Sequence, residues 1–324
     1  MKKQMLKPLL LSTLFTLGFS SSLLANDVVN IAKIDGMPWF NRMAEGVVQA
    51  GKDNNINAYQ VGPANTDAPQ QVKLIEDLIT KKVRAISIVP NDASALEPVL
   101  KKAKQQGIVV LTNESVGQPS ADWDIEVIDN ARFASDYVEE VAKSLGGKGG
   151  YVIYVGGLTV PQHNLWADLF IQYQQAHYPE MFEVTSRMPV AENINDARRT
   201  TIDLVKAHPD LKAVVSFGSQ GPIGAGLAVK EKRLKGKLNV FGMMIPSQAA
   251  ALIKSGNITM GITYDPANAG YALAAVAAKV LKGEAIEDGL VIPHIGKAKV
   301  DHTKKLLQFH KVLKVTQENI DSLY

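Results

Sequence analysis

The stretch AISIVPNDASALEPVLKKAKQQGIVVL, residues 85–111, decides the fold class. It opens with an apolar run at 85–89, continues with a helical pattern over 96–105 and closes with a second apolar run at 108–111. Short apolar strands joined by an amphipathic helix are typical of a parallel sheet, whose faces are covered by its crossover helices. The stretch therefore predicts an α/β fold.

The same alternation continues on both sides of this stretch and forms two cycles. The first cycle has predicted strands at 28–34, 57–61, 85–89, 108–111 and 125–128. The second cycle runs from a helix at 131–145 to a strand at 259–263. We expect two Rossmann-like, doubly wound lobes with parallel sheets, joined by a hinge near Asp129.

A helix at 266–281 and a strand at 290–293 are left over once the second cycle is complete. They fit a further crossing back to the first lobe, which makes the lobes a hinged pair. We therefore assign residues to the two lobes in alternating segments. The N-terminal lobe takes 26–129 and 266–293, and the C-terminal lobe takes 130–265 and 294–324.

Composition narrows the class of protein. The chain has 324 residues, of which 46% are apolar and 21% charged, and it contains no cysteine. These values exclude a disordered chain and a disulfide-stapled miniprotein. Without Lys2, Lys3 and Lys7 the chain carries 32 basic and 32 acidic residues. A balanced charge gives no electrostatic basis for binding nucleic acid, which is not expected as a partner.

Residues 1–25 have the layout of a secretory signal peptide. A basic start is followed by an apolar stretch at 9–19 and by small residues that end at Ala25. The alternative is an uncleaved membrane anchor, but that needs about 20 consecutive apolar residues. We predict cleavage after Ala25 and a soluble protein in the periplasm.

Motifs of enzyme chemistry are missing from the sequence. There is no Walker loop, no G-x-S-x-G elbow, no H-E-x-x-H and no cysteine nucleophile. The first strand-to-helix turn, residues 34–40, lacks the glycine triplet of a dinucleotide site, and the six histidines show no metal-ligand spacing. We expect no catalytic residue, no metal and no cofactor.

The turns that follow the predicted strands instead carry aromatic and hydrogen-bonding side chains. Sugars and polyols suit such a lining, because their C–H faces pack on rings while amides and carboxylates bind their hydroxyls. Purely structural roles are the alternative for some of these residues: Trp39 as a core aromatic, Asn91 as a helix N-cap, and Tyr264 as part of a hinge. The predicted ligand-binding residues are Trp39, Phe40, Asn113, Glu114, Asn130, Gln162, His163, Asn164, Ser219, Gln220, Met244 and Tyr264.

Several stretches carry a family resemblance, namely 70–79, 85–93, 107–111, GMPWF at 36–40, TVPQHNLW at 159–166 and GITYDP at 261–266. With them the chain resembles the periplasmic sugar-binding proteins of the type I periplasmic-binding-protein fold, which serve ABC importers. The stretch TVPQHNLW is most similar to the subgroup that binds autoinducer-2 and rhamnose. The chain departs from the ribose-binding pattern at Asn113-Glu114, at Met244 and at Asn164, where that pattern has charged residues.

The resemblance implies a monomeric receptor that closes two lobes on a small neutral sugar or polyol. Its implied partners are that ligand, an inner-membrane ABC permease and, compatibly, a chemoreceptor. An autoinducer-2 type receptor of the same fold is the main alternative, and a secreted α/β enzyme is a second. A sugar-responsive transcriptional regulator shares the core, but an export signal stands where its DNA-binding segment is expected.

Overall fold

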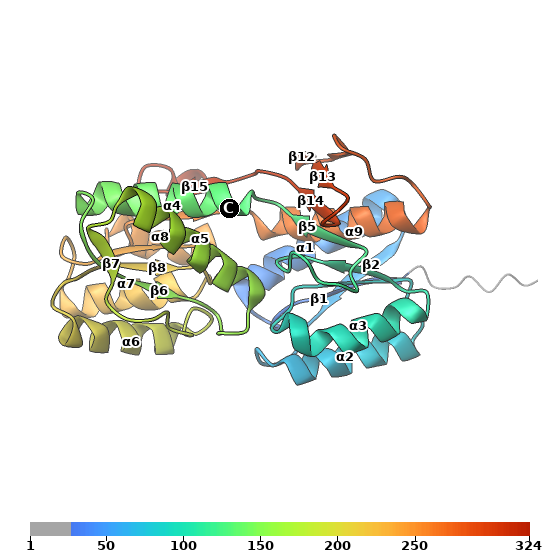
Figure 1. Ribbon diagram of the computed structural model, residues 1–324, viewed down its shortest axis with the longest axis horizontal. Coiled ribbons are helices and arrows are strands. Elements are labelled where there is room, and N and C mark those ends of the chain that lie inside the picture. The colour runs from blue at the N-terminus through green and yellow to red at the C-terminus, as the bar shows by residue number, and fades with distance from the viewer. Residues whose placement is uncertain (1–26) are drawn as a thin grey trace, which may run out of the picture.

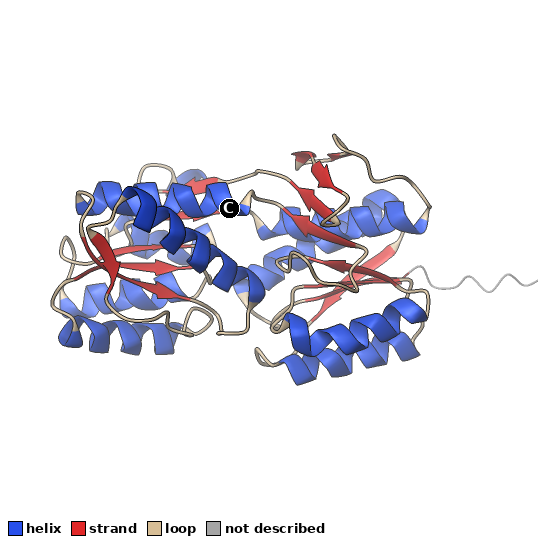
Figure 2. Cartoon of the chain, in the orientation of Figure 1, coloured by secondary structure: helices blue, strands red, loops and turns tan. Residues whose placement is uncertain are grey.

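The computed structural model describes residues 27–324, which form two lobes (Figure 1). Each lobe is built on a mostly parallel sheet with helices on both faces, as Figure 2 shows. The predicted α/β architecture of two doubly wound lobes is confirmed. The predicted signal peptide lies outside the described residues. Within residues 27–324, no helix has both the length and the apolar character that crossing a bilayer requires.

The first sheet contains the five strands predicted for the first cycle, extended at one edge by two short strands near the end of the chain. Helices α2 (Ala68–Thr80) and α3 (Ala93–Gln105) cover one face, and α1 (Pro38–Asn54) and α9 (Pro266–Leu281) cover the other. The strands follow the order β13 (Lys299–Asp301), β14 (Leu306–Gln308), β5 (Trp123–Glu126), β4 (Val109–Thr112), β3 (Ala85–Ile88), β1 (Asp27–Ile31) and β2 (Asn57–Val61).

Alternation along each strand divides the apolar core of this lobe between the two faces. Val28 packs with the α1 and α9 side, and Val29 packs with the α2 and α3 side. Both are fully buried. Neighbouring strands pair in parallel except β13, which is antiparallel to β14. Continuous apolar runs are therefore the sequence signature of this two-sided burial.

The second sheet has the same plan. Helices α4 (Asn130–Leu145) and α5 (Pro161–His177) cover one face, and α6 (Ile194–Ala207), α7 (Gly221–Lys232) and α8 (Pro246–Lys254) cover the other. A short 3₁₀ turn, η1 (Ile320–Ser322), packs beside α8. The strands follow the order β15 (Leu313–Val315), β10 (Met260–Thr263), β9 (Asn239–Gly242), β8 (Leu211–Ser216), β6 (Gly149–Tyr154) and β7 (Met181–Glu183).

The chain crosses between the sheets after β5, after β10 and again between β14 and β15. Helix α9 packs on the first sheet, as the left-over helix is expected to do. The predicted strand at 290–293 instead becomes β11 (Val291–Ile292), which forms a separate hairpin with β12 (Gly296–Lys297). The tail also differs from the expected division, since β13 and β14 belong to the first sheet and only the part from β15 onward joins the second.

Helices α1 and α9 cross in unusually close contact. A Cβ atom built on Gly46 would lie 1.9 Å from the carbonyl oxygen of Ala267, and one on Gly270 would lie 2.1 Å from that of Met43. Only glycine leaves room for backbone at this distance. The crossing sets the positions of Trp39 at the start of α1 and of Tyr264 just before α9.

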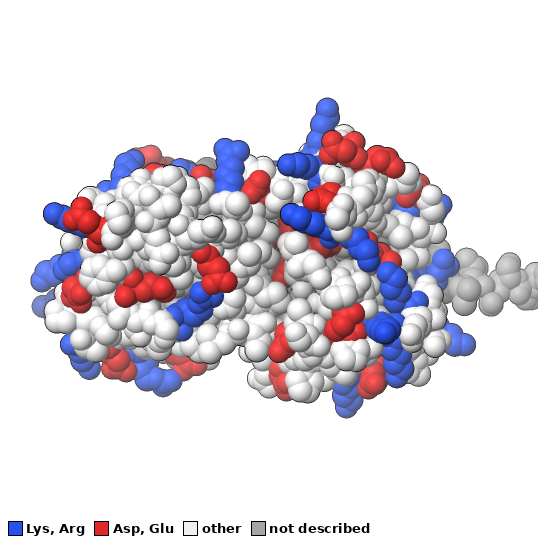
Figure 3. Space-filling view, in the orientation of Figure 1, with Lys and Arg blue, Asp and Glu red and all other residues white. Residues whose placement is uncertain are grey.

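Surface charge is mixed. Figure 3 shows Lys and Arg interspersed with Asp and Glu over both lobes on the face in view. This distribution agrees with the balanced counts of basic and acidic residues in the sequence.

Candidate functional site

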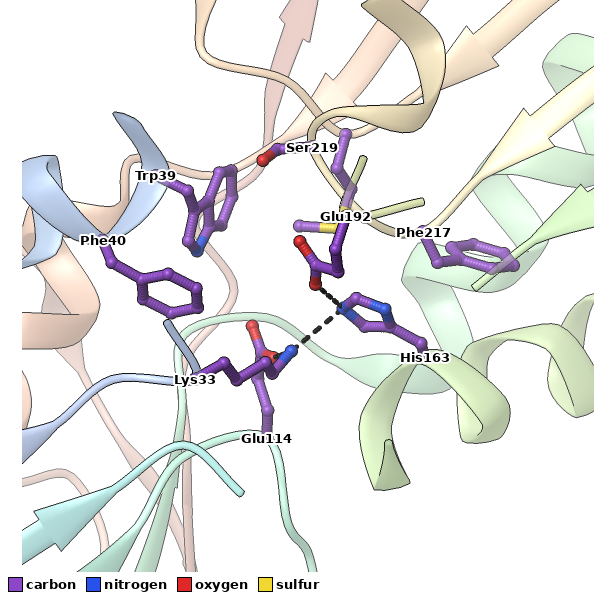
Figure 4. Close-up of a pocket in the computed structure, with 10 residues that line it drawn as sticks. Lys33, Trp39, Phe40, Glu114, His163, Glu192, Phe217 and Ser219 are labelled. Atoms are coloured by element: carbon purple, nitrogen blue, oxygen red, sulfur yellow. Dashed lines mark hydrogen bonds and ion pairs between the residues drawn. The ribbon is translucent and has the colours of Figure 1, made fainter. Parts of the chain in front are cut away.

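A small cavity lies between the lobes, where strands of both sheets end (Figure 4). The side chains around it leave little room, since the centre of a water molecule can reach only about 10 Å³ of it. Ligand pockets of α/β sheets form outside the carboxyl ends of the strands, which is where this cavity lies. The first lobe lines it with Lys33, Trp39, Phe40 and Glu114, and the second with His163, Glu192, Phe217, Gly218, Ser219 and Met243.

A buried ion pair forms the floor on the side of the first lobe. Lys33 Nζ lies 2.6 Å from Glu114 Oε2, and the two side chains are 2% and 3% exposed. The Tyr264 hydroxyl donates to Glu114 Oε1 at 2.6 Å. Because two charges taken out of water are costly, a buried pair is stable only when its remaining oxygens and N–H groups are also satisfied. Tyr264 meets this need for the second carboxylate oxygen.

His163 faces this pair from the first turn of α5. Its Nδ1 accepts a hydrogen bond from the backbone N–H of Gly156 at 2.9 Å, and its Nε2 lies 3.0 Å from Lys33 Nζ. Burial, and then the nearby charge of Lys33, hold the pKa of His163 well below its usual value. The imidazole is therefore neutral at neutral pH.

Glu192 completes the polar part of the site from the loop before α6. Its side chain is 10% exposed, and its Oε1 lies 3.9 Å from His163 Nε2. Burial raises the pKa of Glu192, partly offset by the charge of Lys33. A Cβ atom on Gly156 would lie 2.8 Å from the Glu192 carboxylate, so glycine is what admits this side chain.

Aromatic and thioether side chains form the apolar walls. Trp39 and Phe40 come from the start of α1, and Met243 follows β9. The ring of Phe217 points away from the cavity and packs in the core of the second lobe. Trp39 is 4% exposed and meets the ring of Tyr264 edge to face, with ring centroids 5.0 Å apart. The two interpretations of Trp39, as pocket wall and as core aromatic, therefore both hold.

The structure brings five of the predicted ligand-binding residues to the cavity wall: Trp39, Phe40, Glu114, His163 and Ser219. Tyr264 lies one contact behind, on Glu114. Met244 turns away from the cavity into the core of the second lobe, and its neighbour Met243 lines the wall instead.

The remaining predicted residues make hydrogen bonds outside the cavity wall. Asn113 Nδ2 donates to the carbonyl of Ile125 at 2.7 Å. Asn164 Nδ2 donates to the carbonyl groups of Gly157 and Val160. The Asn130 side-chain oxygen accepts from Gln162 and from Trp166, and Gln220 pairs with Gln248.

The helix cap expected at Asn91 is formed by the next residue. Asp92 accepts a hydrogen bond from the N–H of Ala95 at 2.9 Å. Asn91 instead donates through Nδ2 to the carbonyl of Lys33 at 2.8 Å. Asn91 thus links the end of β3 to the backbone that carries the pocket lysine.

Sequence reasoning missed Lys33, Glu192, Phe217 and Gly218. Lys33 directly follows the apolar residues 28–32 and was therefore counted as part of the predicted strand. A charged residue at the end of a buried apolar strand is itself a sign of a functional site, and this sign was available in the sequence. Glu192 lies in an irregular loop that no strand or helix pattern marks.

Two further carboxyl groups lie buried behind the pocket, at alternate positions of β5. Glu126 Oε1 accepts from the backbone N–H of Glu114 at 2.8 Å, and Asp124 Oδ2 accepts from Thr112 at 2.6 Å. Burial raises the pKa of Asp124 to about 6 and that of Glu126 well above its usual value. The pair is therefore partly protonated near neutral pH.

The effect of Glu126→Gln on the free energy of unfolding is expected to become steadily more stabilising as the pH rises from 5 to 8. A carboxyl group with a raised pKa in the folded state contributes stability at low pH that is lost as the pH rises through that pKa. The amide keeps the acceptor for the Glu114 N–H and gives up only the long contact at 3.4 Å from Gln162 Nε2 to Glu126 Oε2. Urea unfolding at both pH values measures the difference, and an equal effect at pH 5 and 8 contradicts the assignment.

Comparison with known proteins agrees with the architecture. A model of the periplasmic binding protein domain matches residues 28–285. The ribose import binding protein of Bacillus subtilis is 25% identical over 289 residues, 86% of each chain. A xylitol-binding protein of Mycolicibacterium smegmatis is 26% identical over 306 residues, covering 90% of this chain and 85% of the relative.

Solved structures share the fold over nearly their whole length. LsrB from Clostridium saccharobutylicum, in complex with AI-2, superposes with a TM-score of 0.86 at 19% identity and covers 92% of this chain and 99% of its own. A solute-binding protein of an ABC transporter from Clostridium phytofermentas, with bound L-rhamnose, gives 0.85 at 21% identity over 92% and 98%.

These relatives are binding proteins, which confirms the expectation that the chain is not an enzyme. The two-lobe fold, the cavity between the lobes and the match over residues 28–285 agree with one another. The chain belongs to the periplasmic binding protein family and has the type I fold of its sugar-binding members.

Proposed function

We propose that the protein captures a small neutral sugar or polyol between its lobes in the periplasm and delivers it to an ABC importer. The observation that carries this proposal is the cavity, in which aromatic rings of the first lobe face hydrogen-bonding groups of both lobes.

The charges in the cavity favour a neutral ligand. Lys33 is already balanced by Glu114, and His163 is neutral. Glu192 adds acceptor oxygens and, when ionised, a negative charge that disfavours acids. Trp39 and Phe40 supply ring surfaces on which the C–H groups of a sugar pack.

Ligand contacts on both lobes couple binding to a hinge motion. A ligand that touches Trp39 on one lobe and His163 on the other binds the closed arrangement better than an open one, and only this difference shifts the population. An inner-membrane permease that accepts the closed form then receives loaded protein. The names of relatives such as the ribose import binding protein support a transport role, and a chemoreceptor is a compatible second partner.

A thermal-shift panel on the protein tests this function. The panel holds D-ribose, D-arabinose, L-rhamnose, D-allose, xylitol, myo-inositol and autoinducer-2, with D-glucuronate as a charged control. A ligand at 100 times its Kd stabilises the folded state by about 2.7 kcal/mol, which is a clear rise in Tm. We expect a neutral sugar or polyol to raise Tm most. Failure of every neutral compound contradicts the proposal, and a response to autoinducer-2 alone favours the signal-receptor alternative.

Trp39→Ala is expected to weaken binding of the panel ligand by about 1–3 kcal/mol, roughly 5- to 150-fold, because the ring stacks on the sugar face. The same change lowers Tm, since the ring also packs on Tyr264. Phe170→Leu is the control, because Phe170 is fully buried in the core of the second lobe and does not line the cavity. Titration calorimetry separates the two effects, and equal affinities of the Trp39 and Phe170 variants would show that the ring does not contact ligand.

A further inference from the structure

The N–H group of His163 faces another hydrogen-bond donor, Lys33 Nζ, and this arrangement indicates what kind of ligand atom the site binds. A neutral imidazole has one N–H donor and one acceptor nitrogen. The backbone N–H of Gly156 points at Nδ1, so Nδ1 must accept and the proton is on Nε2. Nε2 then directs its N–H toward Lys33 Nζ, which is 3.0 Å away and is itself a donor.

The Gly156 contact fixes the tautomer, because a backbone N–H cannot give up its proton or turn away. Lys33 Nζ has a strong acceptor in Glu114 Oε2 at 2.6 Å and needs nothing from the imidazole. Two N–H donors from opposite lobes therefore converge on one place in the cavity (Figure 4). An oxygen acceptor that lies to one side, within hydrogen-bond distance of both nitrogens, satisfies both donors.

Glu192, next to these two donors, lacks a hydrogen-bond donor for its carboxylate within residues 27–324. Its Oε1 lies 3.9 Å from His163 Nε2. The side chain is nine-tenths buried and points into the cavity. A buried carboxylate without donors is costly, so it favours a ligand O–H group.

We propose that Lys33, His163 and Glu192 form a recognition unit for two adjacent oxygens of the ligand. One oxygen accepts from Lys33 Nζ and His163 Nε2, and the neighbouring hydroxyl donates to Glu192. The ligand is thus a vicinal diol or an α-hydroxy carbonyl compound, and Glu192 is its specificity-determining residue. This inference rests on the proposed function and refines the ligand class.

The test compares parent sugars with analogues that lack one hydroxyl. D-ribose, L-rhamnose and xylitol are titrated with their monodeoxy analogues into wild type, Glu192→Leu and Glu192→Gln. Wild type should bind one monodeoxy analogue about 10- to 100-fold more weakly than its parent. Glu192→Leu should bind that pair within about threefold of each other, with the parent weakened. Glu192→Gln, which keeps an acceptor oxygen, should retain part of the discrimination.

Glu183→Leu is the matched control, since Glu183 is a partly buried glutamate of the second lobe that lines a different cavity. Its discrimination should equal that of wild type. Discrimination that survives in Glu192→Leu, or that is absent in wild type, overturns the inference while leaving sugar binding in place. If no parent sugar binds wild type, the proposed function itself fails.

A second measurement does not depend on any ligand or on the folding of a variant. Long-range nitrogen–proton NMR correlations of wild type at pH 7.5 report the tautomer of His163. We expect the proton on Nε2. A proton on Nδ1 removes the converging donors and overturns the inference.

Discussion

Lys33→Met is expected to lower the free energy of unfolding by about 3–5 kcal/mol and to abolish ligand binding. Lys33 is the cation that compensates Glu114 at a position where both side chains are almost completely buried. Removing it leaves a carboxylate in the protein interior with only the Tyr264 hydroxyl as a partner. Chemical unfolding of wild type and variant at pH 7.5, followed by titration calorimetry, measures both losses.

The double variant Lys33→Met/Glu114→Gln separates stability from binding. It removes both charges and keeps the acceptor oxygen for Tyr264, so most of the lost stability should return. Binding should not return, because the donor toward the ligand is still missing. A single variant that unfolds like wild type would show that the pair is solvated rather than buried.

Gly46→Ala is expected to destabilise the protein by more than about 3 kcal/mol and to weaken ligand binding. Overpacking usually costs about 1–3 kcal/mol, and here the added carbon would lie 1.9 Å from a backbone oxygen that no rotamer change can move. Helices α1 and α9 must separate, which displaces Trp39 relative to Tyr264 at the cavity wall. Unfolding and binding measurements on the same preparation test both effects.

Gly157→Ala is the control for this prediction. Its added carbon would lie 3.4 Å from a Val160 methyl group, an ordinary contact, and its φ is not in the left-handed region. It should change stability by less than about 1 kcal/mol. If Gly46→Ala were as mild as Gly157→Ala, the close helix crossing would be wrong.

Periodicity predicted most of the fold because long elements leave a strong pattern. Helix α9 begins and ends where the sequence places it, at Pro266 and Leu281, with Asp265 as its N-cap. The last strands were not predictable in the same way. β14 has three residues, of which only Leu307 is buried, so no apolar run distinguishes it from a loop. For this reason residues 294–308 were wrongly assigned to the second lobe, whereas β13 and β14 belong to the first sheet.

The site residues that lie in strand-to-helix turns could be predicted from the sequence, and those elsewhere could not. Trp39 and His163 lie in the first turns of helices that start with Pro38 and Pro161, so their placement near the ends of the strands follows from topology. Whether an amide such as Asn113 faces the cavity or a neighbouring backbone carbonyl depends on a single rotamer. Such a choice is made by tertiary contacts that no local pattern encodes.

The most direct test of the account is a crystal structure of the protein with the panel compound that binds most tightly. We predict that the ligand lies against Trp39 and Phe40, with its oxygens in hydrogen-bond contact with Lys33 on one lobe and with His163 and Glu192 on the other. A ligand that contacts one lobe only, or that binds outside this cavity, would contradict the claim that the two lobes share its recognition.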